Sequence, residues 1–311
     1  MDPRDLVDPE LLPLLDAWPT VTLDAELLPV ARGRTLPFPS PESTGTTLER
    51  RHVPGPAEAP DIQLHIYKPD AAADPLPCIY HIHGGGYVMG AASELEFIHR
   101  PLVAELGCAL VSVDYRLAPE SPHPGPVEDC YAGLAWLHAN AADLGIDSAR
   151  IGVMGESAGG GLAAALALLA RDRGEYPLAF QHLIYPMLDD RTCIAEPHPH
   201  AGRFVWNADS NRFGWRSLLG HAPGVPDVSP YAAPARAVEL AGLPPTYLST
   251  AALDLFVDED IDYAKRLIRA GVPTELHVYP GAFHGFNILG TARVAQQARV
   301  DSTAALRRAL A

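Results

Sequence analysis

The chain has 311 residues, 48% of them hydrophobic, and a formal net charge of -15 at pH 7. That length can bury a large core, either in one α/β domain with an insertion or in two ordinary domains. The acidic balance lacks the basic surface that nucleic acids and anionic membranes require, so we expect neither as a partner.

The N-terminus is acidic and proline-bearing, without the apolar run that a signal peptide needs, and no later run approaches the apolar length of a membrane span. We therefore expect a soluble, cytoplasmic protein. Four cysteines are widely spaced without a C-x-x-C pair: Cys78, Cys108, Cys130 and Cys193. Buried thiols account for this spacing better than disulfides or a zinc site.

The first segment, residues 1–45, predicts short amphipathic helices from its apolar residues between Leu6 and Trp18, interrupted by prolines. It ends in a proline-rich stretch at residues 36–41. Residues 62–67 then alternate between apolar and polar side chains, which is typical of a strand with one solvated face. We expect this strand at or near the edge of a sheet.

Apolar runs and helical patterns alternate in the rest of the chain. The expected strands are 78–83, 108–113, a run from Ile151, 180–185, 246–250 and 275–279. Helical spacing appears between them, for example in 97–106 and 127–137, and after Ser157. The alternation predicts an α/β fold with a mainly parallel sheet that is covered on both faces.

One interval, residues 188–234, shows prolines and no regular periodicity. It also holds arginines and four aromatic residues: Arg203, Arg212, Arg216, Phe204, Trp206, Phe213 and Trp215. A stretch of this length inside a compact α/β domain is usually functional. We expect a cap insertion that covers the carboxyl edge of the sheet together with residues 1–45. A peripheral subdomain unrelated to substrate is the alternative.

The pentapeptide Gly155-Glu156-Ser157-Ala158-Gly159 reads G-x-S-x-G between a short apolar run and a long alanine- and leucine-rich run. This context predicts a strand, a sharp turn and a helix, with the serine hydroxyl exposed on a strained backbone. The glycines are needed because the strand and the helix pass too close for side chains. A glycine-rich turn with an incidental serine is the alternative for the pentapeptide alone.

A serine nucleophile needs a histidine base that a third group orients. Asp254 and His284 each follow a strand, in the chain order serine, acid, histidine. A purely structural histidine is the alternative for His284. Rival acids are Asp258, Glu259 and Asp260. They open an evident helix, whose dipole favours acidic residues in its first turn without any catalytic role.

The run His83-Gly84-Gly85-Gly86-Tyr87 follows an apolar strand. Consecutive glycines let backbone N–H groups approach a ligand, so this glycine run, with the N–H of Ala158, is a candidate for an oxyanion hole. A phosphate-binding loop is the rival, but the lysine and Ser/Thr of a P-loop and the spacing of a dinucleotide fingerprint are missing. His81 and His83 could share a strand face as metal ligands, although no third ligand is evident and anchoring of the glycine loop is the simpler account.

Together these motifs resemble the hormone-sensitive lipase group of α/β hydrolases over about residues 45–300. They are His83 to Tyr87, Asp114 to Glu120, Gly155 to Gly160, Asp254 with Asp258-Glu259, and His284 to Phe286. There are two departures: Glu156 stands where aspartate is commoner, and residues 121–126 replace a more apolar run. We expect neither to affect the chemistry.

The resemblance implies an α/β-hydrolase fold with a mostly parallel eight-stranded sheet, helices on both faces and a helical cap. The catalytic domain would comprise 46–187 and 235–311, and the cap 1–45 and 188–234. Ser157 would be the nucleophile, His284 the base and Asp254 the orienting acid. The resemblance also implies oxyanion donors at Gly85, Gly86 and Ala158, while Asp114 to Glu120 would be scaffolding.

The implied activity is that of a carboxylesterase for small esters with short acyl chains, without cofactor or metal. We expect substrate contacts from Tyr87 and from Phe204, Trp206, Phe213 and Trp215 of the cap. An amidase or deacetylase with the same triad stays open as an alternative. A non-catalytic small-molecule receptor on the same fold is less favoured, because that lineage loses the histidine that His284 supplies here. The family alone suggests a homodimer, formed through the edge of the last strand.

Overall fold

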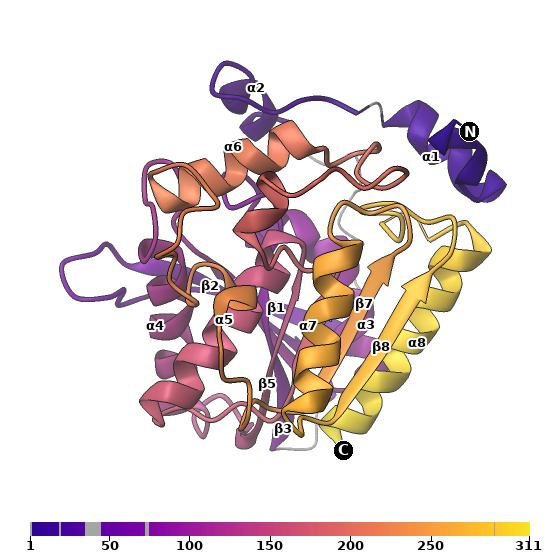
Figure 1. Ribbon diagram of the computed structural model, residues 1–311. Helices are drawn as coiled ribbons and strands as arrows, with labels where there is room; N and C mark the ends of the chain where they lie inside the picture. Colours follow the sequence, from indigo (N-terminus) through magenta and orange to yellow (C-terminus); the bar gives the residue numbers. More distant parts are fainter. Residues whose placement is uncertain (1, 19, 35–44, 72–74, 289) are drawn as a thin grey trace.

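The computed structural model describes residues 2–18, 20–34, 45–71, 75–288 and 290–311. In this part of the chain, eight strands form one sheet in the order β1-β2-β4-β3-β5-β6-β7-β8 (Figure 1). The strands are β1 Thr46–Val53, β2 Ile62–Pro69, β3 Leu76–Ile82, β4 Ala109–Asp114, β5 Ile146–Glu156, β6 Gln181–Ile184, β7 Thr246–Ala251 and β8 Thr274–Tyr279. β2 runs antiparallel to both β1 and β4, and the other neighbours are parallel. The mainly parallel sheet is confirmed.

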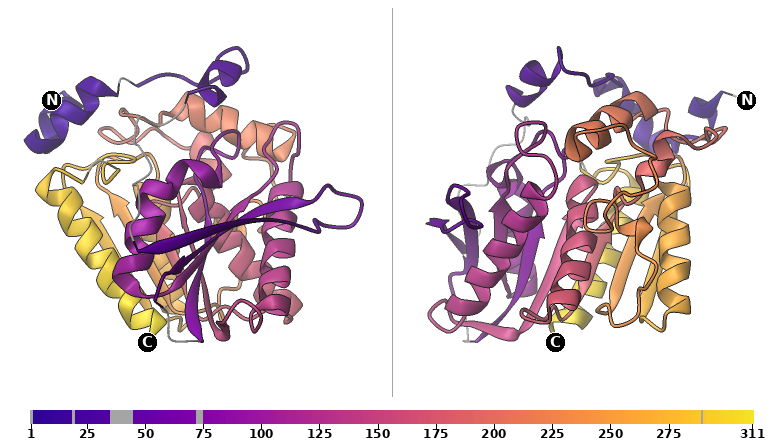
Figure 2. Two further views of the ribbon diagram at one scale, coloured as in Figure 1. Left: turned by 180° about the vertical axis from the view of Figure 1, so that it is seen from behind. Right: turned by 60° about the vertical axis from the view of Figure 1, so that its left-hand side comes forward.

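Helices cover both faces of the sheet (Figure 2). The longer helices are α3 Glu96–Leu106, α4 Gly125–Asn140, α5 Ala158–Arg173, α6 Ala208–Leu219, α7 Val257–Arg269 and α8 Arg293–Leu310. α3 and α8 pack on one face, and α4, α5 and α7 on the other. Because helices cover both faces, β3 and β4 are buried along almost their whole length and are mainly apolar, with His81 and Ser112 as buried polar exceptions.

The antiparallel end of the sheet differs from expectation at two points. The predicted solvated face of β2 is wrong: His65 and Tyr67 are 1% and 0% exposed, because α3 packs over them and the Arg100 guanidinium lies 6.0 Å from the Tyr67 ring centroid. β2 lies second from the end of the sheet, so its expected position near an edge is confirmed, and the edge strand itself is β1, which we did not predict. Its residues are mostly polar and only half-buried or exposed, so hydrophobic patterning gave little signal.

Short helices and α6 lie over the carboxyl edge of the sheet (Figure 1). The short ones are the 3-10 turns Pro3–Leu6 and Pro9–Leu11, with α1 Leu12–Ala17 and α2 Leu28–Arg32. These confirm the helices expected in the first segment. The proline-rich stretch at 36–41 lies outside the described residues. The domain boundaries at 45, 187 and 235 stay a prediction.

Helix α6 contradicts the expected lack of periodicity in residues 188–234. The Asn207 side chain accepts a hydrogen bond from the Ser210 amide and so caps the start of the helix, and Gly220 ends it in a left-handed conformation (φ 72°). Trp215 and Leu218 are buried at helical spacing. The cap and stop signals around this stretch could have predicted the helix.

The N-terminal segment is tied to α6 and to the glycine loop by hydrogen bonds. The Leu23 amide donates to Ser210 Oγ at 2.9 Å, and Asn207 Nδ2 donates to Thr22 Oγ1 at 3.0 Å. At the end of α2, Arg32 donates to the carbonyl of Val88 at 2.7 Å. The segment therefore spans from the insertion to the loop that follows β3.

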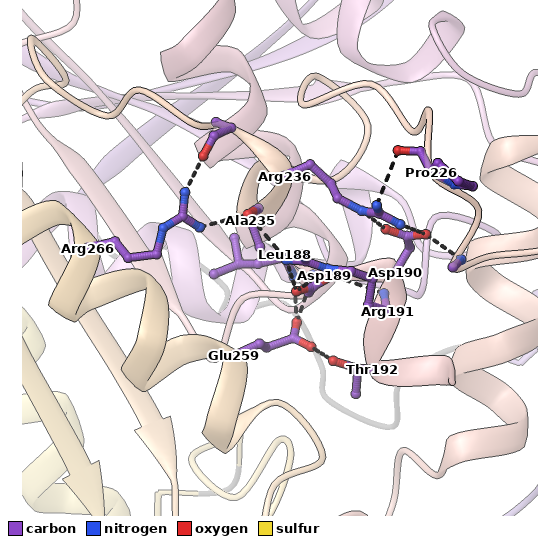
Figure 3. A network of polar contacts seen from close by, with 12 residues as sticks. Leu188, Asp189, Asp190, Arg191, Thr192, Pro226, Ala235, Arg236, Glu259 and Arg266 are labelled. Carbon is purple, nitrogen blue, oxygen red and sulfur yellow. Dashed lines mark hydrogen bonds and ion pairs between the residues drawn. The ribbon is translucent and has the colours of Figure 1, made fainter. Parts of the chain in front are cut away.

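A buried polar group, which we call the basal cluster (Asp190, Arg236 and Glu259), holds the two ends of the insertion together (Figure 3). Asp190 and Arg236 form a two-pronged ion pair with distances of 2.8 and 2.9 Å. Glu259 of α7 accepts hydrogen bonds from the amides of Leu188 and Asp189 at 2.7 and 3.1 Å. The start of the insertion is thus fixed to both its end and the catalytic layer.

All four cysteines are free and buried, as expected. Burial raises the pKa of the Cys78 and Cys130 thiols well above the usual range. Among the described residues, no helix combines the length and the apolar character that crossing a membrane requires.

Candidate active site

Ser157 stands on a sharp turn between β5 and α5, with φ 57° and ψ -124°. A residue other than glycine rarely adopts this region, and such strain is typical of functional turns. The surrounding structure maintains it: the Ser157 amide donates to the Ile184 carbonyl at 2.9 Å, and the Ser157 carbonyl accepts from the Met187 amide at 2.9 Å. The turn thus has the predicted geometry.

The two glycines of the pentapeptide lie in backbone contact with neighbouring segments. A Cβ on Gly155 would lie 2.3 Å from the Gly159 carbonyl oxygen, and one on Gly159 would lie 2.1 Å from the Ile82 carbonyl oxygen. Any side chain would force the strand, the turn and the helix apart. The requirement for glycine is steric, because neither residue has a positive φ.

His284 and Ser157 meet although 127 residues separate them. The Nε2 atom of His284 is 2.9 Å from Ser157 Oγ, and both residues are 7% exposed. The histidine follows β8 in a loop whose Ala282 carbonyl accepts from the Leu253 amide at 2.9 Å. The rings of Tyr185 and Phe256 flank the imidazole, with centroids at 4.9 and 5.3 Å.

Asp254 lies behind the imidazole, in the turn after β7. Its Oδ2 is 2.7 Å from His284 Nδ1, its Oδ1 accepts from the Phe256 amide at 3.1 Å, and it is 1% exposed. Nδ1 donates to this carboxylate, so Nε2 is free to accept the serine proton.

The rival acids lie elsewhere. Asp258 is exposed in the first turn of α7, as the helix-dipole interpretation expects. Glu259 belongs to the basal cluster, and burial raises its pKa well above the usual range. Asp260 is fully buried, and neither carboxyl oxygen has a hydrogen-bond partner among the described residues. None of the three has a hydrogen bond to His284 within the described residues.

The glycine loop after β3 lies against the serine turn. A Cβ on Gly84 would lie 3.3 Å from the Ser157 Cβ. Gly85 and Gly86 adopt φ values of 115° and 62°, a region that favours glycine. Within the described chain, the amides of Gly85, Gly86 and Ala158 donate to no protein acceptor. Unpaired N–H groups in a loop that touches the serine turn can stabilise an oxygen that becomes negative there.

The comparisons with known proteins agree with this geometry. The family described as alpha/beta hydrolase fold matches residues 79–288. The chain belongs to the hormone-sensitive lipase-like α/β hydrolases. Carboxylesterase NlhH of Mycobacterium tuberculosis is 38% identical over 320 residues, which is 99% of this chain and 97% of the relative. Esterase LipI of the same species is 34% identical, and the alignment covers 92% of this chain and 89% of the LipI chain. The solved structure titled Bacterial Heroin Esterase has a TM-score of 0.90 at 42% identity and covers 99% of each chain.

In this hydrolase the aromatic residues expected to contact substrate occupy different places. Tyr87 and Trp215 are fully buried against each other, with ring centroids 5.3 Å apart, and the Tyr87 hydroxyl donates to the Met187 carbonyl. Phe213 is partly buried against the main core. The contacts of these three side chains are with other parts of the protein. Their expected contact with substrate stays a prediction.

Trp206 contacts the glycine loop, and Phe204 contacts the residue that precedes His284. A Cβ on Gly86 would lie 2.3 Å from the indole of Trp206, and the ring of Phe204 meets that of Phe283 edge-on at 6.0 Å. Their expected contact with substrate stays a prediction.

The hydrolase also contains a contact that we did not expect. Glu156 Oε1 accepts a hydrogen bond from the Gly84 amide at 3.0 Å, and its Oε2 is 2.9 Å from His81 Nε2. The Glu156 carboxylate thus reaches the glycine loop, and the expectation that glutamate at this position does not affect the chemistry stays a prediction. Its position beside Ser157 in the chain was the available signal.

The two strand histidines differ in their partners. His81 contacts Glu156 and Ser112, whereas His83 Nδ1 donates to the Gly84 carbonyl at 2.8 Å and its ring stacks on Tyr115 at 4.3 Å. Both thus anchor the loop. Within the described ranges, no group of three or more His, Cys, Asp or Glu side chains is arranged to hold a metal ion.

Proposed function

We propose that the protein is a serine carboxylesterase which hydrolyses small esters with short acyl chains through an acyl-enzyme intermediate. One observation carries the mechanism: Ser157 Oγ, His284 Nε2 and Nδ1, and Asp254 Oδ2 are linked by contacts of 2.9 and 2.7 Å. The assignment to the ester hydrolases is supported by relatives named carboxylesterase and esterase, which align with almost the whole chain.

In the first half of the reaction, His284 Nε2 takes the proton of Ser157 Oγ as the oxygen attacks the ester carbonyl carbon. The amides of Gly85, Gly86 and Ala158 donate to the oxygen that becomes negative. The bond to the alcohol then breaks, and the imidazolium returns the proton to the leaving oxygen. Asp254 stabilises the imidazolium while it carries the proton.

In the second half, water replaces the alcohol. His284 removes a proton from the water as it attacks the acyl carbon, and a second tetrahedral intermediate forms in the same oxyanion hole. Collapse of this intermediate breaks the bond to Ser157 Oγ, which regains its proton from His284. The carboxylic acid leaves, and the enzyme returns to its initial state.

The proposed preference for short acyl chains is supported by the space around the site. The side chains of Ser157 and His284 are nearly buried, and the Trp206 indole lies directly on Gly86. We place the cap over the site, formed by the segments around α1, α2 and α6. The homodimer through the outer edge of β8 stays a prediction. A cytoplasmic location is supported by four cysteines that are all free thiols.

The test is hydrolysis of p-nitrophenyl acetate, butyrate and palmitate by the wild type and by Ser157→Ala. We expect turnover of the two short esters, little turnover of palmitate, and a loss of about 10⁴-fold or more in kcat when the nucleophile is removed. Hydrolysis that survives in Ser157→Ala would overturn the mechanism, and preferred hydrolysis of palmitate would overturn only the acyl-chain assignment.

The acid is tested in the same assay with a matched pair. Asp254→Asn should lower kcat by about 10⁴-fold, because the amide no longer holds the imidazole in the productive tautomer. Asp258→Asn, an exposed change four residues away, should have almost no effect. The reverse ranking would show that another carboxylate orients His284.

A further inference from the structure

A chain of buried polar contacts leads from β4 to the glycine loop. The Nδ1 atom of His81 is 3.1 Å from Ser112 Oγ, and its Nε2 is 2.9 Å from Glu156 Oε2. Glu156 Oε1 in turn accepts from the Gly84 amide at 3.0 Å. His81 and Ser112 are 1% and 0% exposed and face each other directly in the β3–β4 register.

The Glu156 carboxylate fixes the direction of the bonds that it forms. A carboxylate accepts only, so His81 Nε2 donates to Glu156. The other ring nitrogen of His81 contacts Ser112 Oγ. Burial raises the pKa of Glu156, but His81 and the Gly84 amide lower it more, so that it lies below the ordinary value. The bond from Gly84 is therefore charge-assisted, which makes it stronger than a bond between neutral groups.

This bond acts at the point where the glycine loop begins. A Cβ on Gly84 would lie 2.9 Å from the Glu156 carbonyl oxygen, so the two backbones touch. The peptide that carries the Gly84 carbonyl also carries the Gly85 amide, one of the proposed oxyanion donors. The direction of the Gly85 N–H thus depends on how Gly84 is held. His83 holds the Gly84 carbonyl from the other side at 2.8 Å.

We propose that His81 is a positioning residue of the esterase: by orienting the Glu156 carboxylate, it fixes the Gly84–Gly85 peptide so that the Gly85 amide points at the oxyanion. The inference rests on the proposed function, since it concerns the oxyanion hole of that reaction. It also accounts for glutamate at position 156, because one carboxylate has to reach both the loop amide and a histidine on the neighbouring strand.

The other buried histidines provide a contrast. Both ring nitrogens of His99 lack a hydrogen-bond partner among the described residues, and burial lowers its pKa well below the usual range. His182 of β6 resembles His81 more closely: it is 2% exposed, and its Nε2 lies 2.8 Å from Ser302 Oγ. The hydrogen-bond partner of His182, Ser302, belongs to α8 and not to the glycine loop. His182 is therefore a suitable control.

The experiment compares His81→Leu, His81→Gln and the control His182→Leu in hydrolysis of p-nitrophenyl acetate, with active sites counted by a fluorophosphonate that labels Ser157. We expect His81→Leu to lower kcat by about 10- to 100-fold with KM nearly unchanged, because the donor is misplaced only for the transition state. His81→Gln should recover most of the rate, since its Nε2 can donate to Glu156. His182→Leu should keep the wild-type kcat.

A transition-state analogue gives a second readout. A trifluoromethyl ketone forms a hemiketal with Ser157 whose oxygen occupies the oxyanion hole, so its Ki should rise in His81→Leu by the same factor as kcat/KM falls. A general loss of packing would instead lower the number of titratable sites and leave the Ki of the remaining sites unchanged. That outcome would contradict the proposal.

A double-mutant cycle separates action through Glu156 from any other role of His81. If His81 acts through the carboxylate, His81→Leu should cost little more once Glu156→Ala is present. Additive losses would overturn the proposal, as would wild-type kinetics in His81→Leu while Ser157→Ala is inactive. If Ser157→Ala itself remains active, the proposed function fails, independently of His81.

Discussion

At the scale of single residues, the sequence contained enough to select the candidate reacting groups. Ser157, Asp254 and His284 follow the parallel strands β5, β7 and β8 in the chain order that brings their side chains together, and the structure places them within hydrogen-bond distance. The contacts of Glu156 could not be predicted in the same way. The reach of Glu156 to Gly84 and His81 depends on strand order and register, which no local pattern encodes.

Asp260 leads to a prediction on pH and stability. Burial raises its pKa well above the usual range, and the neighbouring Glu259 adds to the rise. A carboxyl group with a raised folded-state pKa stabilises the fold fully below its unfolded pKa, and this contribution is lost as pH rises through the folded pKa. Between the unfolded-state pKa, about 4, and the raised folded-state pKa, ionisation of this group should lower the free energy of unfolding of the wild type by about 1.4 kcal/mol per pH unit.

Asp260→Asn should remove this slope, because the amide does not ionise. The free energy of unfolding in urea, measured from pH 5 to pH 8, should therefore rise for the variant relative to the wild type as pH increases. Asp258→Asn, at the exposed carboxylate of the same first turn of α7, should keep the wild-type slope. A difference between Asp260→Asn and wild type that does not change with pH would refute the assignment.

At the scale of elements, hydrophobic periodicity predicted those strands and helices that are buried on the side the pattern assumes. It did not predict β1, whose polar residues pair through the backbone, nor the second covered face of β2. Helix α6 was missed because only part of one side is apolar, with Trp215 and Leu218 among small and polar residues. Its end signals were more informative than its periodicity.

The basal cluster gives a prediction at this scale. Asp190 and Arg236 have side chains 0% and 12% exposed, so loss of the guanidinium leaves a carboxylate buried without its charge partner. Arg236→Ala should cost about 3–5 kcal/mol in the free energy of unfolding. The matched change Arg212→Ala removes the exposed pair with Asp209 and should cost less than about 1 kcal/mol. Unfolding in guanidinium chloride measures both changes. Equal losses of unfolding free energy in the two variants would show that the buried pair contributes no more to stability than the exposed one.

At the scale of the whole molecule, the segment before β1 closes over the sheet edge from which the site is built (Figure 2). Arg32 attaches it, through bonds to the carbonyls of Val88 and Ala118 at 2.7 and 2.9 Å and an ion pair with Glu120. The general position of this segment followed from its amphipathic helices and from the resemblance. Its attachment by one arginine did not, because that depends on long-range contacts.

Arg32→Ala should release this segment without disturbing the chemistry. We expect faster cleavage by thermolysin within residues 20–34 and a higher KM for p-nitrophenyl butyrate, with kcat changed by less than about 2-fold. Arg34→Ala, an exposed neighbour, is the control and should match the wild type. If proteolysis and KM are both unaffected in Arg32→Ala, the segment is held by its other contacts.

The backbone contacts of Gly155, Gly159 and Gly84 also decide where this enzyme can be redesigned. Side chains are excluded at these positions by carbonyl groups of the adjoining turn, strand and loop. Most variants with a side chain at these three positions should therefore fail to fold. Phe204 and Trp206 contact Phe283 and Gly86, so an engineer who seeks new substrates should randomise these two positions and leave the glycines fixed.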